Sequence, residues 1–217
     1  VTPTMKNDFT SLFKGHNLIF ITAEGFSHLA VNENLTPTLF KMVNKGFYFE
    51  NFYTPLWGVS TSDGEHVATT GLIPKAGIWS FSLSSKNYLP FTLGNQFKSL
   101  GYMTKAYHNH SYDYFDRDLS HPNIGYDYKG IGNGLIMDDI WPRSDLDMMK
   151  VTIPEYIDED KFHAYYMTIS GHLWYSFKEH AMARKNRNKV EHLDYSPTVK
   201  AYLASQIELD LALEYLE

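Results

Sequence analysis

The chain has 217 residues, of which 43% are hydrophobic, 16% aromatic and 20% charged, and its net charge is −6. This composition provides for a packed core, excludes a wholly disordered chain, and argues against a general nucleic-acid binder. The chain has no cysteine, which excludes disulfides, thiolate zinc sites and cysteine nucleophiles.

The first quarter of the chain has the pattern of a buried strand followed by a helix. Residues 17–23 form a short apolar run rich in β-branched and aromatic side chains, which is typical of a strand inside a parallel sheet. Residues 36–46 begin with Thr-Pro and end with Gly, the signals that start and stop a helix. Aromatic residues dominate 47–53, and we expect this segment to be extended.

A second helix is predicted from the residues around Ser62. Ser62 and Glu65 have the spacing of a capping box, so a helix should begin near Thr61 and end near Gly71. The remaining patterns predict two helices, over 93–100 and over 145–156, and the second is broken at Pro154. They predict two more strands, over 102–107 and 162–169. Residues 110–145 have the composition of a loop, and 178–195 that of a solvated loop or short helix before a last helix. The alternation of strands and helices predicts an α/β sandwich with a mostly parallel sheet.

Both ends of the sequence suggest a piece of a longer chain. The first residue is Val1, and no signal peptide is present. No run of about 18 apolar residues predicts a membrane-spanning helix. The last helix has an apolar stripe that reaches Glu217 without a helix-stop signal and consists of Val199, Leu203, Ile207, Leu211 and Tyr215.

Polar and charged side chains follow three of the predicted strands. Glu24 follows the first strand, His108 and His110 lie at the end of the strand predicted around 102–107, and His172 follows the last. Ligands bind beyond the carboxyl ends of strands in open parallel sheets, so we expect these groups to converge on one rim. Thr61 should lie in the same region, at the start of its helix.

Thr61, Glu24 and His172 each permit a functional and a structural interpretation. A helix N-terminus at Thr61 would stabilise an alkoxide or a phosphate, but hydroxyl residues there are also common caps. Glu24 is either a ligand for an oxygen-preferring cation or a surface acid at the start of a loop. His172 either donates a hydrogen bond to a phosphoryl oxygen or is a satisfied histidine in a wall of the site.

His108, His110 and Arg117 also permit both a functional and a structural interpretation. His108 and His110 are two residues apart, so they would face one side of a strand and could share a metal, or they could belong to an aromatic-rich polar loop. A His-Asn-His nuclease is disfavoured by the acidic balance. Arg117 could grip a phosphate with its guanidinium, or it could form an ion pair with Asp116 or Asp118.

The ordered set of segments 17–25, 35–39, 49–53, 60–65, 107–108, 115–118, 125–127 and 167–172 covers nearly the whole chain. Together they resemble the extracellular catalytic domain of the lipoteichoic acid synthase family, phosphoglycerol transferases within the sulfatase and alkaline phosphatase superfamily. The resemblance implies a three-layer α/β sandwich. It also implies that residues 1–217 are the N-terminal major part of one sulfatase-like catalytic domain, incomplete at its C-terminal end.

The resemblance assigns roles to individual residues. Glu24 would be a metal ligand, and Thr61 would be both a metal ligand and the nucleophile. The cofactor would be a divalent metal, Mn²⁺ or Mg²⁺, with Zn²⁺ as another possibility. Thr61 would attack the phosphorus of an anionic glycerophospholipid, and a glycerol phosphate polymer or water would accept the phosphoglycerol group. Four residues would bind the substrate: Arg117, His172, His108 and Phe115.

The sequence departs from the family pattern at three places. The family commonly has Lys where Ser60 stands and Trp where Phe115 stands. It completes its metal site with an Asp-His pair on a strand that would come after Glu217. The family's location implies a cell-membrane protein whose catalytic domain faces outward, with the membrane segments outside this chain.

Two alternatives accompany this interpretation. One is another enzyme on the same scaffold, a sulfatase-like or phosphatase-like hydrolase or a phosphoethanolamine transferase. Sulfatases of the main type use a modified Cys or Ser in a Cys/Ser-x-Pro-x-Arg segment, which the Thr-Ser-Asp-Gly-Glu segment at 61–65 does not match. The other alternative is a degenerate domain that binds a cell-wall polymer without chemistry.

Overall fold

The computed structural model describes residues 5–53 and 60–217, and within these residues it contains one parallel sheet. The strand order across the sheet is β1-β5-β2-β3-β4, and every neighbouring pair is parallel. The strands are β1 (Leu18–Thr22), β2 (Met103–Ser111), β3 (Asp127–Ile131), β4 (Gly134–Leu135) and β5 (Phe162–Met167).

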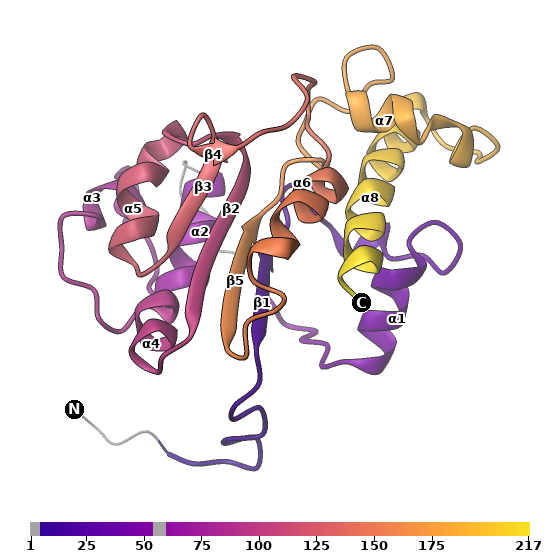
Figure 1. Cartoon of the computed structure of the whole chain (residues 1–217). Helices are drawn as coiled ribbons and strands as arrows, with labels where there is room; N and C mark the ends of the chain where they lie inside the picture. Colours follow the sequence, from indigo (N-terminus) through magenta and orange to yellow (C-terminus); the bar gives the residue numbers. More distant parts are fainter. Residues whose placement is uncertain (1–4, 54–59) are drawn as a thin grey trace.

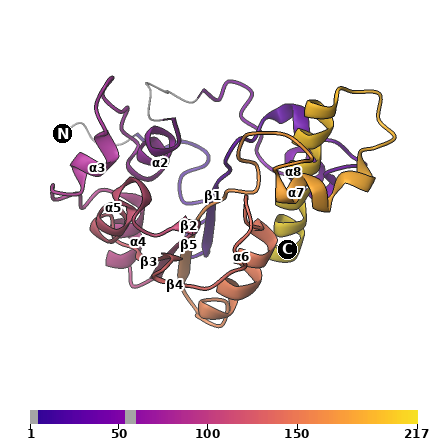
Figure 2. The same cartoon turned by 90° about the horizontal axis from the view of Figure 1, so that it is seen from above.

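Helices cover both faces of this sheet. The α-helices are α1 (Pro37–Lys45), α2 (Ser60–Thr70), α3 (Ser80–Ser84), α4 (Leu93–Ser99), α5 (Arg117–Asn123), α6 (Asp145–Thr152), α7 (Ala181–Lys185) and α8 (Pro197–Leu216). Short 3₁₀ helices lie at His28–Ala30, Tyr114–Asp116, Ile153–Glu155 and Arg187–Lys189. Helices α2 to α5 lie on one side of the sheet, and α1, α6, α7 and α8 lie on the other (Figures 1 and 2). The predicted three-layer α/β sandwich with a parallel sheet is therefore confirmed.

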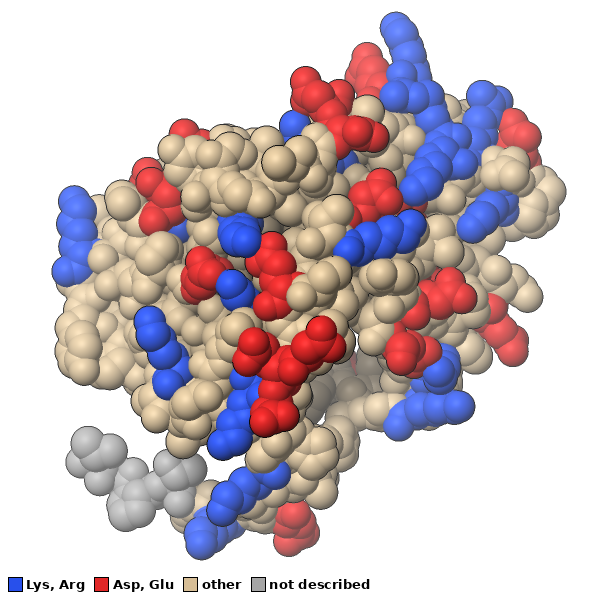
Figure 3. Space-filling model, viewed as in Figure 1, with Lys and Arg blue, Asp and Glu red and all other residues tan. Residues whose placement is uncertain are grey.

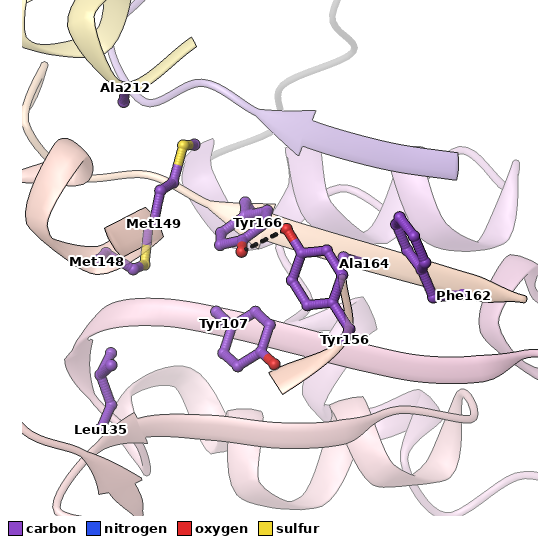
Figure 4. Packing of buried hydrophobic residues seen from close by; sticks show 9 residues of the cluster. All are labelled: Tyr107, Leu135, Met148, Met149, Tyr156, Phe162, Ala164, Tyr166 and Ala212. Atoms are coloured by element: carbon purple, nitrogen blue, oxygen red, sulfur yellow. Dashed lines mark hydrogen bonds between the residues drawn. The ribbon is translucent and has the colours of Figure 1, made fainter. Parts of the chain in front are cut away.

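The core lies on both faces of the interior strand β5, between β1 and β2, and all six residues of β5 are buried. Tyr166 points to the face covered by α6, where it packs beside Met148 and Tyr107, and its hydroxyl lies 3.0 Å from that of Tyr156 (Figure 4). Its neighbour Tyr165 belongs to the cluster on the opposite face. Burial on both faces explains why β5 lacks an apolar–polar alternation.

Most of the predicted elements are present. The strand over 17–23 is β1, the helix over 36–46 is α1 with a proline at its start, and the strand over 162–169 is β5. The helix predicted over 145–156 ends at Thr152, and Pro154 lies in the 3₁₀ turn that follows, as the break at this proline implied.

The loop predicted over 110–145 is wrong in part. This region contains the end of β2, the helix α5 and the strands β3 and β4. Helix α5 is only seven residues long and includes Pro122, and β4 has two residues, so neither has a periodic signal in the sequence. The segment 47–53, expected to be extended, forms no strand and includes a turn, and helix α3 was not predicted.

The capping box predicted at Ser62 and Glu65 is also wrong, although the helix itself is present. Helix α2 begins at Ser60, so Ser62 lies inside it and not at the cap. Among the described residues, the Ser62 hydroxyl is buried and has no hydrogen-bond partner. The Glu65 carboxylate binds Arg117, not the backbone of the first turn. Residues 58 and 59, where a small-residue turn into this helix is expected, lie outside the described residues.

The charged surface carries no large patch of one sign on the face seen in Figure 3, where acidic and basic side chains alternate. An anionic substrate would therefore depend on cationic groups close to its binding site. No described helix has the length and apolar character needed to cross a bilayer.

Candidate active site

The end of β1 and the start of α2 meet at one point. Glu24 lies two residues after β1, and Thr61 lies in the first turn of α2. The Thr61 hydroxyl donates a hydrogen bond of 2.9 Å to Oε2 of Glu24, although the two residues are 37 positions apart in the sequence. Both side chains are partly exposed, so a ligand can reach them. The fold thus brings together the proposed nucleophile and the proposed metal ligand.

Close backbone packing holds Glu24 in this place. The backbone N–H of Glu24 donates to the Thr168 hydroxyl at 3.0 Å, just after β5. Gly25 has a φ of 63° and packs against Gly171, and a Cβ atom built on Gly171 would lie 2.2 Å from the carbonyl oxygen of Glu24. Only glycine at 171 permits this approach, which joins the loop that carries Glu24 to the loop that carries His172.

The oxygen atoms of Glu24 and Thr61 fit a hard divalent cation in type and spacing. Mg²⁺ binds oxygen ligands at about 2.0–2.1 Å in octahedral geometry, so two adjacent ligands are about 2.9 Å apart. The observed separation of 2.9 Å matches this value. Within 5–53 and 60–217, no group of three or more His, Asp or Glu side chains could hold a metal, so these two residues would supply only part of a site.

Arg117 is buried and paired with an acid that the sequence did not indicate. Its Nη2 and Nε atoms lie 2.6 and 2.9 Å from Oε2 of Glu65, and Nη1 donates to the Tyr114 carbonyl at 3.0 Å. The expected alternative was an ion pair with Asp116 or Asp118, and the observed partner on α2 is 52 residues away. Burial opposes the charge of Arg117, but the Glu65 carboxylate outweighs it and raises the pKa of the guanidinium.

Phe115 lies against the same guanidinium. The centre of its ring is 5.3 Å from Cζ of Arg117 and 5.0 Å from the ring of Trp79. Phe115 and Asp116 have φ values of 61° and 54°, which are uncommon for residues with a side chain. This turn directs the chain from the 3₁₀ helix at 114–116 into α5, so that Arg117 points inward.

His108 is a buried histidine on β2. Its Nδ1 lies 2.9 Å from the Met167 carbonyl oxygen of β5. Burial first, and then the nearby Arg117 charge, lower the pKa of His108 well below its usual range, so the ring is neutral. The ring of His110 stacks on it at 5.8 Å, but the described residues do not assemble the shared metal site that the spacing of the two histidines left open.

His172 is partly exposed beyond β5, beside an aromatic residue that the sequence analysis did not single out. The ring of Trp141 lies 5.1 Å from the ring of His172 and 5.4 Å from that of His110. Burial lowers the pKa of His110, and Arg117 and Arg143 lower it further. The two imidazoles and the indole form a partly exposed wall at the carboxyl edge of β2 and β5.

Asp145 holds the backbone of this wall and was also missed. Its side chain is fully buried at the start of α6. Oδ1 accepts hydrogen bonds from the Asn109 amide at 2.9 Å, the Ile169 N–H at 2.9 Å and the Ser170 N–H at 3.2 Å. The carboxylate therefore joins β2 to the segment after β5. The only local signal in the sequence is Ser144, which caps α6.

A comparison with known protein families identifies the family of this chain. The sequence model of the Sulfatase family matches residues 16–215, which is nearly the whole chain. The chain belongs to the sulfatase family. Family membership agrees with the observed fold, in which the Glu24 carboxylate and the Thr61 hydroxyl meet at the rim of a parallel sheet.

Two individual proteins are similar to this chain, one in sequence and one in structure. A lipoteichoic acid synthase-like protein of Bacillus subtilis strain 168, YvgJ, is 27% identical over 122 residues, which are 54% of this chain and 19% of that protein. The crystal structure of the lipoteichoic acid synthase LtaP from Listeria monocytogenes superposes with a TM-score of 0.79 at 20% identity over 96% of this chain. This chain covers 53% of the LtaP chain and under a fifth of YvgJ, so it spans only part of its relatives.

Two other solved structures share the fold. One is a protein of the alkaline phosphatase superfamily from Vibrio parahaemolyticus, with a TM-score of 0.67, 19% identity, and coverage of 92% of this chain and 49% of the other. The second is the C-terminal periplasmic domain of EcEptC from Escherichia coli in complex with Zn, with a TM-score of 0.58, 15% identity, and coverage of 92% and 58%. At these identities the similarity shows the shared fold alone.

Proposed function

We propose that this chain carries the nucleophile of a transferase that moves a phosphoglycerol group from an anionic glycerophospholipid to a glycerol-type acceptor. The observation that carries the proposal is the 2.9 Å contact between the Thr61 hydroxyl and the Glu24 carboxylate. The similarity to proteins named as lipoteichoic acid synthases supports the choice of substrate. Sulfatase-family membership supports an enzyme of phosphoryl or sulfuryl transfer more generally.

In the first step, Oγ1 of Thr61 forms a bond to phosphorus while the bond from phosphorus to the diacylglycerol oxygen breaks. The Thr61 proton is released to solvent, and the diacylglycerol oxygen takes up a proton from solvent. Glu24 orients the hydroxyl by accepting its hydrogen bond, and the N-terminus of α2 stabilises negative charge at Oγ1. A divalent cation, Mn²⁺, Mg²⁺ or Zn²⁺, held by Glu24 and Thr61 would lower the pKa of the hydroxyl and offset the phosphate charge.

In the second step, an acceptor hydroxyl attacks the phosphorus of the Thr61 ester and restores the threonine. His172 and Phe115 are partly exposed and would contact the phosphoglycerol group directly. Arg117 and His108 are buried behind them. Arg117 would supply positive charge, and Nε2 of the neutral His108, whose Nδ1–H is donated to the Met167 carbonyl, would accept a hydrogen bond from a glycerol hydroxyl. All four are proposed substrate-binding residues.

The proposed setting of the enzyme is supported by the same relatives. The acceptor is a glycerol phosphate polymer, and the enzyme acts at the outer face of the cell membrane, anchored by segments outside this chain. Residues 1–217 form the N-terminal major part of one catalytic domain, and further metal ligands come from residues outside it. The coverage of about half of the LtaP chain supports this division.

The nucleophile is tested by Thr61→Ala in the full-length protein, with labelled phosphatidylglycerol as substrate and Mn²⁺ or Mg²⁺ present. Turnover should fall to background, and Thr61→Ser should retain part of it because serine keeps the hydroxyl. Turnover by Thr61→Ala equal to the wild type would refute the assignment. A wild-type protein that binds glycerol phosphate polymer without turnover would support the binding domain instead.

The acceptor is tested by product analysis. With a glycerol-type acceptor present, a transferase forms a phosphoglycerol adduct of that acceptor. A hydrolase releases glycerol phosphate at the same rate with or without it. The alternative enzyme on the same scaffold is a phosphoethanolamine transferase. It would release labelled diacylglycerol from phosphatidylethanolamine and not from phosphatidylglycerol.

A further inference from the structure

We infer that Glu65 is a positioning residue of this site, because it fixes Arg117 and the first turn of α2 in the arrangement that sets Thr61 against Glu24. The inference rests on the proposed function and deepens it. Glu65 has no exposed surface, so it does not contact the substrate itself. It acts through the residues that it holds.

The position of Glu65 on α2 places it beneath Thr61. The two residues are four positions apart, so they lie on the same face of the helix, one turn apart. Oε2 of Glu65 accepts a hydrogen bond from Nε of Arg117 at 2.9 Å and lies 2.6 Å from Nη2, so one oxygen contacts two nitrogens of the guanidinium. The two contacts together fix the direction of the guanidinium as well as its distance.

The second oxygen of Glu65 connects α2 to the sheet. Oε1 lies 3.4 Å from Nε2 of His121 on α5 and 3.4 Å from the hydroxyl of Tyr165 on β5. The Tyr165 hydroxyl also lies 3.0 Å from Oγ1 of Thr22, which can donate to it while the Tyr165 hydrogen is directed to Glu65. Thr22 is the last residue of β1, two positions before Glu24. One carboxylate thus joins the elements that carry the nucleophile, the arginine and the metal ligand.

The charge on this cluster is maintained inside the protein. Burial opposes ionisation of Glu65, but Arg117 and His121 outweigh it and hold the pKa of the carboxyl below its usual range. A buried ion pair of this kind is seldom more stable than a well-packed apolar pair. Its advantage is a fixed geometry, which an active site needs and a core does not.

Glu65→Gln is the most direct test, because glutamine keeps the shape and removes the charge that fixes Arg117. In crystal structures of the wild type and the variant, Arg117 should leave its position and the hydrogen bond from Thr61 to Glu24 should break. Unchanged positions of Arg117 and Thr61 would overturn the inference. This readout does not depend on the substrate, so it fails separately from the proposed function.

The second readout is kinetic. A displacement of about 1 Å at a reacting group costs on the order of 100-fold in rate, so kcat for phosphatidylglycerol should fall about 100-fold per folded molecule. The matched control is Met148→Ala, which creates a cavity in the core on the opposite face of the sheet and lowers stability without touching the site. Activity of Glu65→Gln per folded molecule equal to that of the control would show a merely structural role and overturn the inference.

A conservative variant keeps the test open if Glu65→Gln does not fold. Glu65→Asp retains the charge and shortens the side chain by one methylene group. The carboxylate should then pull away from Arg117, so that the guanidinium moves from its wild-type position or the contacts lengthen. We expect kcat between those of the wild type and background, with wild-type activity in Glu65→Asp contradicting the inference. If the wild type itself shows no turnover, the proposed function fails, and the crystallographic comparison still decides the role of Glu65.

Discussion

Replacing Gly171 by alanine tests how the fold positions Glu24. Gly171 follows β5, and its Cα faces the carbonyl oxygen of Glu24, with the Gln206 amide on the other side. A Cβ atom at this position would lie 2.2 Å from the Glu24 oxygen and 2.6 Å from the Gln206 nitrogen. The nearer contact is with backbone, which cannot rotate away as a side chain can.

The size of the effect follows from that distance. A Cβ atom needs about 3.4 Å from an oxygen, so the Glu24 backbone would move by roughly 1 Å. Overpacking of this kind typically costs about 1–3 kcal/mol of stability. A shift of about 1 Å in a group next to the nucleophile lowers the rate by on the order of 100-fold. We therefore expect activity to fall much further than stability alone would cause.

Urea unfolding and turnover of labelled phosphatidylglycerol measure the two effects on the same protein. Gly64→Ala is the matched control, because nothing lies within 4 Å of a Cβ atom at this helical position. That change should raise stability by about 0.5–1 kcal/mol, since alanine favours a helix over glycine. Gly171→Ala with wild-type stability and turnover would refute the argument that the two loops fix Glu24.

Two further predictions concern residues around the site. Arg117→Ala should lower both turnover and Mn²⁺ content, the latter measured by metal analysis of the purified protein, because it leaves the buried Glu65 carboxylate without its partner and so disturbs the turn that holds Thr61 against Glu24. An unchanged Mn²⁺ content would contradict the positioning role of the Glu65–Arg117 pair. Asp145→Ala should lower the free energy of unfolding, measured by urea unfolding, by about 3 kcal/mol or more. Three buried N–H donors would each lose a hydrogen bond worth about 1–3 kcal/mol. A loss below about 1 kcal/mol would contradict the role of Asp145.

The approach of Thr61 to Glu24 could be anticipated because each residue has a local signal and a general rule connects them. An apolar run ends just before Glu24, a helix begins near Thr61, and parallel sheets gather their functional groups at the carboxyl edge. The prediction also required these strands to be neighbours in one sheet, and β1, β5 and β2 are adjacent in the structure. The structure supplies the distance of 2.9 Å, which no sequence pattern contains.

Glu65 shows why the rest could not be predicted. The Ser-x-x-Glu spacing is a valid local signal for a capping box, and it indicated the right helix. The carboxylate instead pairs with Arg117, 52 residues away, because the fold buries both groups and each needs a partner of opposite charge. A local pattern cannot indicate a partner that only the tertiary structure supplies.

The loop-like region was misjudged for a related reason. Helix α5 and strand β4 are too short to show a period, and β3, which is as long as β1, has Asp, Lys and Gly where β1 has a continuous apolar run. Packing against the sheet stabilises these elements where propensity does not. The same region carries Phe115 and Arg117, whose inward direction depends on two residues with positive φ. Positive φ outside glycine is enriched in Asn and Asp, so Asp116 carries a weak signal for this turn and Phe115 carries none.

The most direct measurement is a search for the covalent intermediate on Thr61. The full-length protein is incubated with Mn²⁺ and phosphatidylglycerol, quenched in acid, digested and analysed by mass spectrometry. The account predicts a glycerophosphoryl group on the peptide that contains Thr61, absent from Thr61→Ala and from samples without lipid. Efficient turnover with this peptide unmodified at every time point, or with the group on another residue, would contradict it.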